Sequence, residues 1–279
     1  MSTLSTGESA TDHASSSEAV RAGSAEPSDS GLADPGDRRG RRTAAVIPAA
    51  GRGVRLGPGV PKALRTLSGV PMLVHAVRAL ARARAVSLVV VIAPPDGADG
   101  VRHLLDEHNL PDVTVVPGGE TRQDSVRLGL AALPESVDAV LVHDAARPLV
   151  PVETVEAVVS AVREGAPAVV PALPVPDTVK EVEPRPGGGP EPVTGTPDRS
   201  RLRAVQTPQG FARTVLAEAH ERVAREGDGA TDDAGMVERL GHRVVVVPGH
   251  EEAFKVTRPL DLVLAEAVLA RRRATDGGF

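Results

Sequence analysis

Short aliphatic runs spaced along most of the chain constrain its fold more than any other feature. They occupy residues 44–47, 88–92, 113–116, 139–142, 168–170 and 243–247. Continuous apolar runs of this length are typical of parallel strands that are buried on both faces. Helical patterns lie between them, as after Pro71, where Leu73, Val74, Val77 and Leu80 recur at intervals of three and four. Strands that alternate with helices predict an α/β fold, with a mostly parallel central sheet flanked by helices.

Five further helices are expected from similar patterns. Either Asp124 or Ser125 could cap a helix that runs to Leu133, and Thr231-Asp232 precedes a second capped helix. The other three are expected over residues 152–164, over residues 212–225 and from Pro259 onward.

The ends of the chain differ in composition from its middle. Residues 1–42 are rich in Ser, Ala, Gly, Asp and Glu and almost lack large apolar side chains. Such a segment buries too little surface to offset its ordering entropy, so we expect a disordered tail. The tail ends in a basic cluster within residues 38–42. Two interpretations remain: a solvated tail without activity, or a tail that binds a partner. The remaining sequence predicts one folded domain over residues 43–274 and a short C-terminal tail over residues 275–279.

The alternation of strands and helices breaks between Asp177 and Arg203. Residues 179–182 and 192–194 have strand-like patterns on either side of the Gly-Pro-rich stretch 186–190. This arrangement predicts a hairpin-like arm that projects from the sheet, roughly over residues 178–202, with a plain flexible loop as the alternative.

Composition excludes several classes of function. The chain has no Trp or Tyr and only three Phe, which nearly excludes binding of single strands by aromatic stacking. Its formal net charge of −5 argues against a general nucleic-acid binder. It has no Cys, and therefore no disulfide, thiol nucleophile or Cys-based zinc site. No long apolar run or secretory h-region is present, so we expect a cytoplasmic protein without a membrane span.

The polar and glycine-rich segments directly follow predicted strands, where ligands bind in open α/β sheets. The first runs from Pro48 to Gly57 and leads to Pro61-Lys62. Small residues allow close approach of a ligand, amide groups there can cradle phosphates, and Arg55 and Lys62 add positive charge. The spacing matches neither GxGxxG nor a P-loop, and a tight strand–helix turn is the alternative.

Four more segments could carry chemistry. Residues 118–125, GGETRQDS, can read a base edge or simply cap a helix. In HDAARP, residues 143–148, Asp144 could hold Mg²⁺ and Arg147 could clamp a phosphate, although an Asp–Arg pair is also a common structural ion pair. QTPQG, residues 206–210, and FKVTRP, residues 254–259, have alternative interpretations as a turn and as surface charge.

In this order, these segments resemble the methylerythritol phosphate cytidylyltransferases. The resemblance runs from about Ala44 to Arg272 and rests on PAAGRGVRLGPGVPK, GGETRQDSV, HDAARP, DTVK, QTPQGF and FKVTRPLDL. It implies a Rossmann-like core, an arm that interlocks two subunits of a homodimer, and transfer of CMP from CTP to a methylerythritol phosphate with a divalent cation. The chain also ends soon after the last helix, so a fused cyclodiphosphate synthase domain is not expected.

The resemblance also implies a role for individual residues. The catalytic cations would be Arg55, Lys62 and Lys255, together with Arg199 from the partner's arm. Asp144 would bind Mg²⁺ or another divalent cation, and Glu252 is a candidate for a second acidic contact. The cytosine and ribose site would be lined by Ala49, Ala50, Gly51, Gly119 and Ser125, with Glu120 and Arg122 nearby. Ala145 would also contact the substrates, and Arg147, Thr178, Thr207 and Thr231 would surround the sugar phosphate.

Three other functions remain as alternatives. A ribitol-5-phosphate cytidylyltransferase would share the fold and the chemistry, but Ala145-Ala146 and Lys180 favour methylerythritol phosphate. A non-catalytic nucleotide sensor would be expected to lack one of the cations or Asp144. A dinucleotide-binding dehydrogenase is disfavoured by the glycine spacing and by the missing acidic residue about 20 positions after the loop.

Overall fold

A computed structural model of the chain describes residues 42–51, 61–226 and 232–276. The predicted tail therefore lies outside the described residues, apart from Arg42, where the first strand begins. The last helix continues to Asp276, so the predicted short C-terminal tail begins inside that helix.

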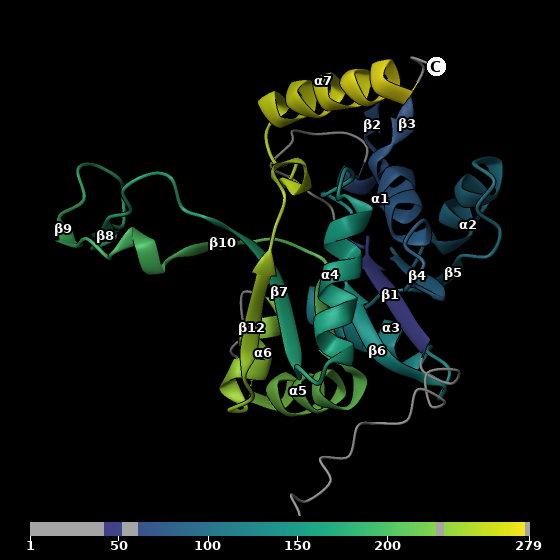
Figure 1. The fold of residues 1–279 in the computed structure, drawn as a ribbon, viewed down its shortest axis with the longest axis horizontal. Coiled ribbons are helices and arrows are strands. Elements are labelled where there is room, and N and C mark those ends of the chain that lie inside the picture. Colours follow the sequence, from purple (N-terminus) through teal and green to yellow (C-terminus); the bar gives the residue numbers. More distant parts are fainter. Residues whose placement is uncertain (1–41, 52–60, 227–231, 277–279) are drawn as a thin grey trace, which may run out of the picture. The chain divides into compact units, whose positions relative to one another are not determined.

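The centre of the structure is an eight-stranded sheet within the described part of the chain (Figure 1). Its strands are β1 Arg42–Pro48, β4 Leu88–Ala93, β5 Thr114–Pro117, β6 Val137–Val142, β7 Ala168–Pro174, β10 Arg203–Val205, β11 Gln209–Ala212 and β12 Val244–Pro248. The order is β10-β7-β11-β6-β1-β4-β5, and β12 also pairs with β7. Only β10 and β11 run against the others, which confirms the predicted mostly parallel sheet.

Helices cover both faces of the sheet, and each face has its own aliphatic core. Helices α1 Met72–Ala81, α2 Ala98–Glu107 and α4 Val152–Arg163 pack on the face that carries Ile47, Val91 and Leu141. Helices α3 Arg122–Ala131, α5 Arg213–Glu226 and α6 Asp233–Arg239 pack on the opposite face, around Phe211. Because both faces of each central strand are buried, the strands read as unbroken apolar runs in the sequence.

Helix α7, Pro259–Asp276, lies at the end of the molecule that carries a small hairpin (Figure 1). The hairpin pairs β2 Thr66–Leu67 with β3 Val70–Pro71. The two elements share a third apolar cluster that includes Leu67, Val256 and Ala265. Three short 3₁₀ turns complete the described structure, at Lys62–Leu64, Arg199–Arg201 and Glu251–Ala253.

The hairpin arm is present and projects from the β7–β10 side of the sheet (Figure 1). Its two strands, β8 Glu181–Val182 and β9 Val193–Gly195, pair antiparallel on either side of the Gly-Pro-rich stretch. Nearly all of its residues are exposed, including Val179, Val182 and Val193. The arm thus has almost no core of its own in a single chain.

Three local expectations differ from the structure. Helix α3 is capped by Thr121, whose hydroxyl accepts the Asp124 amide, so neither Asp124 nor Ser125 is the cap. QTPQG is only partly a connection, because residues 206–208 link β10 to β11, whereas Gln209 begins β11, which is inserted antiparallel between β6 and β7. Helix α2 was not expected, because only Val101 and Leu105 of its residues are buried.

No helix among the described residues is long and apolar enough to cross a membrane.

Candidate active site

Two adjoining pockets lie beyond the carboxyl ends of β1 and β6. The larger has a volume of about 220 Å³ and extends toward the turn after β5. The smaller, of about 180 Å³, extends toward Lys62. Both are lined by Pro48, Gly51, Asp144 and Lys255. The strand ends therefore bring together segments that are up to about 200 residues apart in the sequence, as expected for an open α/β sheet.

Most of the predicted site residues line these pockets. The larger is lined by Ala50, Gly51, Gly119, Glu120, Arg122 and Ser125. The smaller is lined by Ala49, Lys62 and Ala145. Asp144 and Lys255 line both. Two of the remaining predicted residues, Arg55 and Thr231, lie outside the described residues.

The turn after β5 requires glycine where it meets helix α3. A Cβ atom at Gly119 would lie 2.4 Å from the Asp124 Cβ, which is far inside van der Waals contact. The Gly119 amide donates to the Ser125 hydroxyl at 3.2 Å, and that hydroxyl donates to the Thr121 carbonyl at 2.9 Å. The sequence GGETRQDS thus forms a tight backbone wall for the larger pocket.

Asp144 is the electrostatic centre of the site. Its carboxylate lies 2.7 Å from the Lys255 ammonium and 4.0 Å from the guanidinium groups of both Arg122 and Arg147. Burial alone would raise the pKa of Asp144, but Lys255 and the two arginines hold it below its ordinary value. Asp144 is therefore ionised at neutral pH and is surrounded by three cationic side chains.

An ion pair with a buried carboxylate holds Arg122 in place. Its Nη2 donates to Asp233 at 2.7 Å, and the other Asp233 oxygen lies 3.0 Å from His220 Nε2. Asp233 is fully buried, and although burial alone would raise its pKa, His220 and Arg122 lower it. The carboxylate thus fixes a guanidinium that lines the larger pocket.

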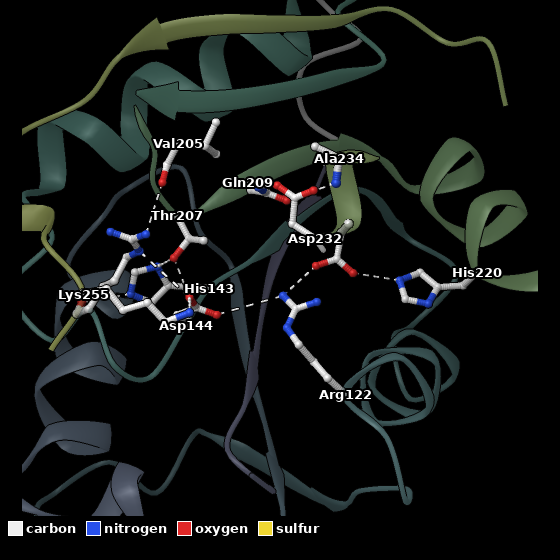
Figure 2. A network of polar contacts seen from close by, with 12 residues as sticks. Arg122, His143, Asp144, Val205, Thr207, Gln209, His220, Asp232, Ala234 and Lys255 are labelled. Carbon is white, nitrogen blue, oxygen red and sulfur yellow. Dashed lines mark hydrogen bonds and ion pairs between the residues drawn. The ribbon is translucent and has the colours of Figure 1, made fainter. Parts of the chain in front are cut away.

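A second polar chain holds the loop that carries Asp144 (Figure 2). Burial lowers the pKa of His143 to about 4, so its imidazole is neutral at pH 7. Its Nε2 contacts the Arg147 carbonyl, which can only accept, so Nε2 carries the hydrogen. Nδ1 therefore accepts from the Thr207 hydroxyl, and that oxygen in turn accepts the Asp144 amide at 3.0 Å.

Some predicted residues are placed away from the pocket walls or are engaged elsewhere. Arg147 donates to the carbonyls of Ala253 at 2.7 Å and Val205 at 3.2 Å, so it joins three segments of the backbone. Thr178 and Arg199 are exposed on the arm and line neither pocket of the same chain.

Glu252 is paired away from the two pockets. It forms ion pairs with Arg271 and Arg272 of α7 and lines neither of them. The described residues contain no group of three or more His, Cys, Asp and Glu that could hold a metal ion. Asp144, a single carboxylate beside a phosphate-sized space, fits Mg²⁺, which usually takes one or two carboxylates and completes its shell with water and substrate phosphate oxygens.

Sequence reasoning missed the supporting residues. Asp233 and His220 lie in helices α6 and α5, and nothing in their local pattern distinguishes them from surface polar residues. Gln209 was noted only as part of a motif. Its amide nitrogen donates to Asp232 at 2.6 Å and its oxygen accepts the Ala234 amide, which fixes the start of α6 (Figure 2).

Comparison with known proteins identifies the family. A profile of the family described as IspD, 2-C-methyl-D-erythritol 4-phosphate cytidylyltransferase, matches residues 43–271. The chain is 74% identical over 242 residues to the 2-C-methyl-D-erythritol 4-phosphate cytidylyltransferase of Streptomyces avermitilis, covering 85% of this chain and 96% of that protein. This chain belongs to that family.

Other similarities agree with this assignment. The protein of the same name from Frankia casuarinae is 56% identical over 230 residues, with 82% of each chain covered. The crystal structure of 2-C-methyl-D-erythritol 4-phosphate cytidylyltransferase from Thermus thermophilus superposes with a TM-score of 0.64 at 38% identity, covering 80% of this chain and 97% of that one. As a member of the IspD family, the chain is a nucleotidyltransferase enzyme with a Rossmann-like core.

Proposed function

We propose that this chain transfers CMP from CTP to 2-C-methyl-D-erythritol 4-phosphate in the biosynthesis of isoprenoid precursors by the non-mevalonate route. The products are 4-diphosphocytidyl-2-C-methyl-D-erythritol and pyrophosphate. The observation that carries the proposal is the convergence of Lys62, Lys255, Arg122 and Asp144 on two adjoining pockets at the strand ends. Two pockets side by side suit a reaction between a nucleotide and a second phosphorylated substrate.

In the proposed reaction, an oxygen of the substrate's 4-phosphate attacks the α-phosphorus of CTP. The new P–O bond forms as the bond from the α-phosphorus to the bridging oxygen breaks, and pyrophosphate leaves. The attacking phosphate is already an anion at neutral pH, so the reaction needs no general base. Such transfers are catalysed chiefly by positioning and by fixed positive charge. Arg55, Lys62 and Lys255 would supply that charge.

The larger pocket is proposed to hold the cytidine. Ala50, Gly51 and Gly119 have little or no side chain, so a base and a ribose can contact the backbone there. Ser125 and Glu120 lie in the same pocket and offer hydrogen-bonding groups. Arg122, held by Asp233, would meet the triphosphate with a guanidinium whose position is already set.

The smaller pocket is proposed to hold the phosphates and the start of the acceptor. It contains Lys62, Ala49 and Ala145. The metal proposed here is Mg²⁺ or another divalent cation. Asp144 would hold it together with phosphate oxygens, and when bound it would neutralise phosphate charge. Arg147, Thr207 and Thr231 are proposed to shape the acceptor site.

We also propose that the protein works in the cytoplasm as a homodimer, without nucleic-acid or membrane partners. Thr178 and Arg199 lie on an arm that extends from the molecule, and that arm exposes three valines. An arm that packs on a second copy would cover the valines and bring Arg199 to the partner's site. The domain from residue 43 to 274 would be the catalytic unit.

The deciding experiment measures pyrophosphate release by the purified full chain with CTP and Mg²⁺. Release that requires methylerythritol phosphate and stops in EDTA is the expected result. Release only with ribitol 5-phosphate would keep the chemistry and overturn the acceptor. Absence of release with either acceptor, from folded protein that binds CTP, would favour a nucleotide sensor.

A further inference from the structure

A third cavity, separate from the active site, lies where helices α1 and α7 end. Its volume is about 680 Å³, within the range of small-molecule sites. It lies between α1, the start of α4 and the last turns of α7, and it shares no lining residue with the two active-site pockets. We call it the arginine pocket, after Arg78, Arg82, Arg271, Arg272 and Arg273, which all line it.

The charge of the arginine pocket is opposite to that of the whole chain. Two glutamates, Glu153 and Glu252, also line it, so three positive charges remain when its histidines are neutral. The formal net charge of the chain is −5. His75, also in the pocket, has its pKa lowered by burial and by nearby Arg78 and Arg273, as expected in a positive environment. Such a cavity attracts a multiply charged anion.

The arginines in the pocket are not all engaged by the protein. Arg271 and Arg272 pair with Glu252, and one Nη of Arg78 donates to the His108 carbonyl. The side chains of Arg82 and Arg273 have no hydrogen bond or ion pair with any other described residue. Arginines near helix C-termini also stabilise the helix dipole. Stabilisation of the helix dipole needs only one cation at each helix end. It does not explain why the arginines of two helix ends lie around the same cavity.

The walls between the arginines are apolar. Val70, Ala79, Leu149 and Leu269 line the same cavity. A ligand that matches both the arginines and the apolar walls has a head group with several negative charges and a small uncharged body. A diphosphate carries a charge between about −2 and −3 near neutral pH, because its third ionisation lies close to neutral pH, as does the second ionisation of a phosphate monoester. Its oxygens suit the fork of a guanidinium.

Two segments of backbone connect the arginine pocket with the active site. Leu149 follows Asp144 and Arg147, and its carbonyl accepts from Arg272 at 2.8 Å. Glu252, paired with α7, precedes Ala253, whose carbonyl accepts from Arg147. An anion that competes with Glu252 for Arg271 and Arg272 would therefore act on the loop that leads to Lys255.

We propose that the arginine pocket is an effector site that binds a diphosphate-bearing small molecule and changes turnover at the active site. The molecule is either free pyrophosphate or an organic diphosphate with a short apolar body. Both present the same head group to Arg78, Arg82 and Arg273.

The test uses the full chain, the double variant Arg82→Ala/Arg273→Ala, and Arg84→Ala as a matched control. Arg84 is exposed, follows α1 and does not line the pocket. Calorimetry with n-pentyl diphosphate and with inorganic pyrophosphate measures binding, and initial rates with and without each probe measure the effect on kcat/KM. None of these arginines is placed in the active site, so all three proteins should have the same activity without a probe.

The expected result is that at least one probe changes kcat/KM of the wild-type protein by twofold or more. The double variant should lose this effect and bind about tenfold to a hundredfold more weakly, since each charge-assisted contact supports about a tenfold change in affinity. Arg84→Ala should behave as the wild type. Equal effects of both probes show that the diphosphate group alone is recognised, as free pyrophosphate requires, whereas a stronger effect of the pentyl compound shows that the apolar body is recognised and identifies an organic diphosphate.

Three results would overturn the proposal. The first is absence of binding outside the active site. The second is an effect of n-pentyl diphosphate that the double variant retains, which would place this probe at the catalytic pockets, where pyrophosphate is expected to inhibit in any case as the product of the proposed reaction. The third is binding that leaves kcat/KM of the wild-type protein unchanged.

Discussion

At the scale of single residues, the site depends on one carboxylate surrounded by cations. Asp144 is only 17% exposed, and a buried carboxylate without a partner would be costly. Lys255 at 2.7 Å and two arginines at 4.0 Å remove that cost. We propose that the same cations bind the phosphates of the substrates, which would compete with the carboxylate for them. The ionic network therefore prepares the site before any substrate arrives.

Lys62→Ala should lower kcat by about 10²–10³-fold, the effect of removing one group that stabilises a transition state. Lys62 lines the smaller pocket, where negative charge would accumulate on the leaving pyrophosphate. Steady-state pyrophosphate release measures the effect, and a thermal unfolding curve verifies that the variant is folded. A folded variant with normal turnover would remove Lys62 from the mechanism.

Asp233→Asn should act at a distance, by releasing Arg122. The guanidinium would lose its charged acceptor at 2.7 Å and no longer be fixed at the pocket wall. We expect the KM for CTP to rise about tenfold, corresponding to about 1.4 kcal/mol, with a smaller change in kcat. Kinetics at varied CTP measure this split. A fall in kcat alone, with KM unchanged, would contradict a positioning role for Asp233.

At the scale of elements, function depends on the turns at the carboxyl ends of the strands. The turns after β1, β5 and β6 supply the small residues, the backbone wall and the carboxylate respectively. Helix α3 packs closely on the sheet, because a Cβ at Gly129 would lie 2.7 Å from Ile92 and 2.9 Å from Val46. The close packing keeps Thr121, Arg122 and Ser125 at a constant distance from the strand ends.

Gly119→Ala should disturb the turn after β5. The added Cβ would lie 2.4 Å from Asp124 Cβ, next to the helix backbone, so the turn must shift. We expect kcat/KM for CTP to fall by about 10–100-fold, the scale of a displacement of about 1 Å in a site. Gly100→Ala on α2, with nothing within 4 Å, is the control and should keep full activity while gaining about 0.5–1 kcal/mol of stability. Equal activity of both variants would show that the turn does not shape the nucleotide site.

The arm gives a prediction about the assembly. If Arg199 acts in the partner's site, co-expressed Arg199→Ala and Lys62→Ala chains should regain activity, although each alone is impaired. A mixed dimer then has one site with an intact Lys62 and an intact Arg199 from the other chain. Sedimentation analysis verifies that mixed dimers form. Mixed dimers without recovered activity would mean that Arg199 acts within its own chain.

At the scale of the whole molecule, the central sheet lies between two aliphatic cores, and the polar residues of the site lie beyond the carboxyl ends of its strands. Asp233, the first residue of α6, is an exception, because it is fully buried, with Arg122 and His220 as its partners. Breaking such a buried pair commonly costs about 3–5 kcal/mol. The network around Asp233 thus contributes both to stability and to the position of Arg122.

This arrangement predicts how stability depends on pH. The pKa of Asp233 in the folded protein lies below its ordinary value of 3.8, so its contribution is present above that pH. It is lost as the pH falls through the lower folded value. Urea unfolding of the wild type and of Asp233→Asn should therefore differ most near pH 7, and the difference should shrink below about pH 4. A difference that stays constant down to pH 3 would contradict the ionic role of Asp233.

Much of the fold and of the site could be predicted from the sequence alone. The central strands are local aliphatic runs, because burial on both faces demands apolar residues at every position. The segments after them, such as Pro48–Gly51 and Asp144–Ala146, line the pockets because the carboxyl ends of parallel strands lie on the same side of the sheet. Lys255 could be placed only through the resemblance, although it contacts Asp144 directly.

Other features depended on the tertiary structure. The insertion of β11 between β6 and β7 joins residues about 70 and about 40 positions apart, and its short, mixed sequence carries no strand signal. His220, Asp233 and Arg122 come from three different helices, so no local pattern relates them. The convergence of the arginines of α1 and α7 on one cavity is likewise a matter of packing. Local patterns determine which segments are buried, whereas the pairing of distant segments determines which polar groups meet.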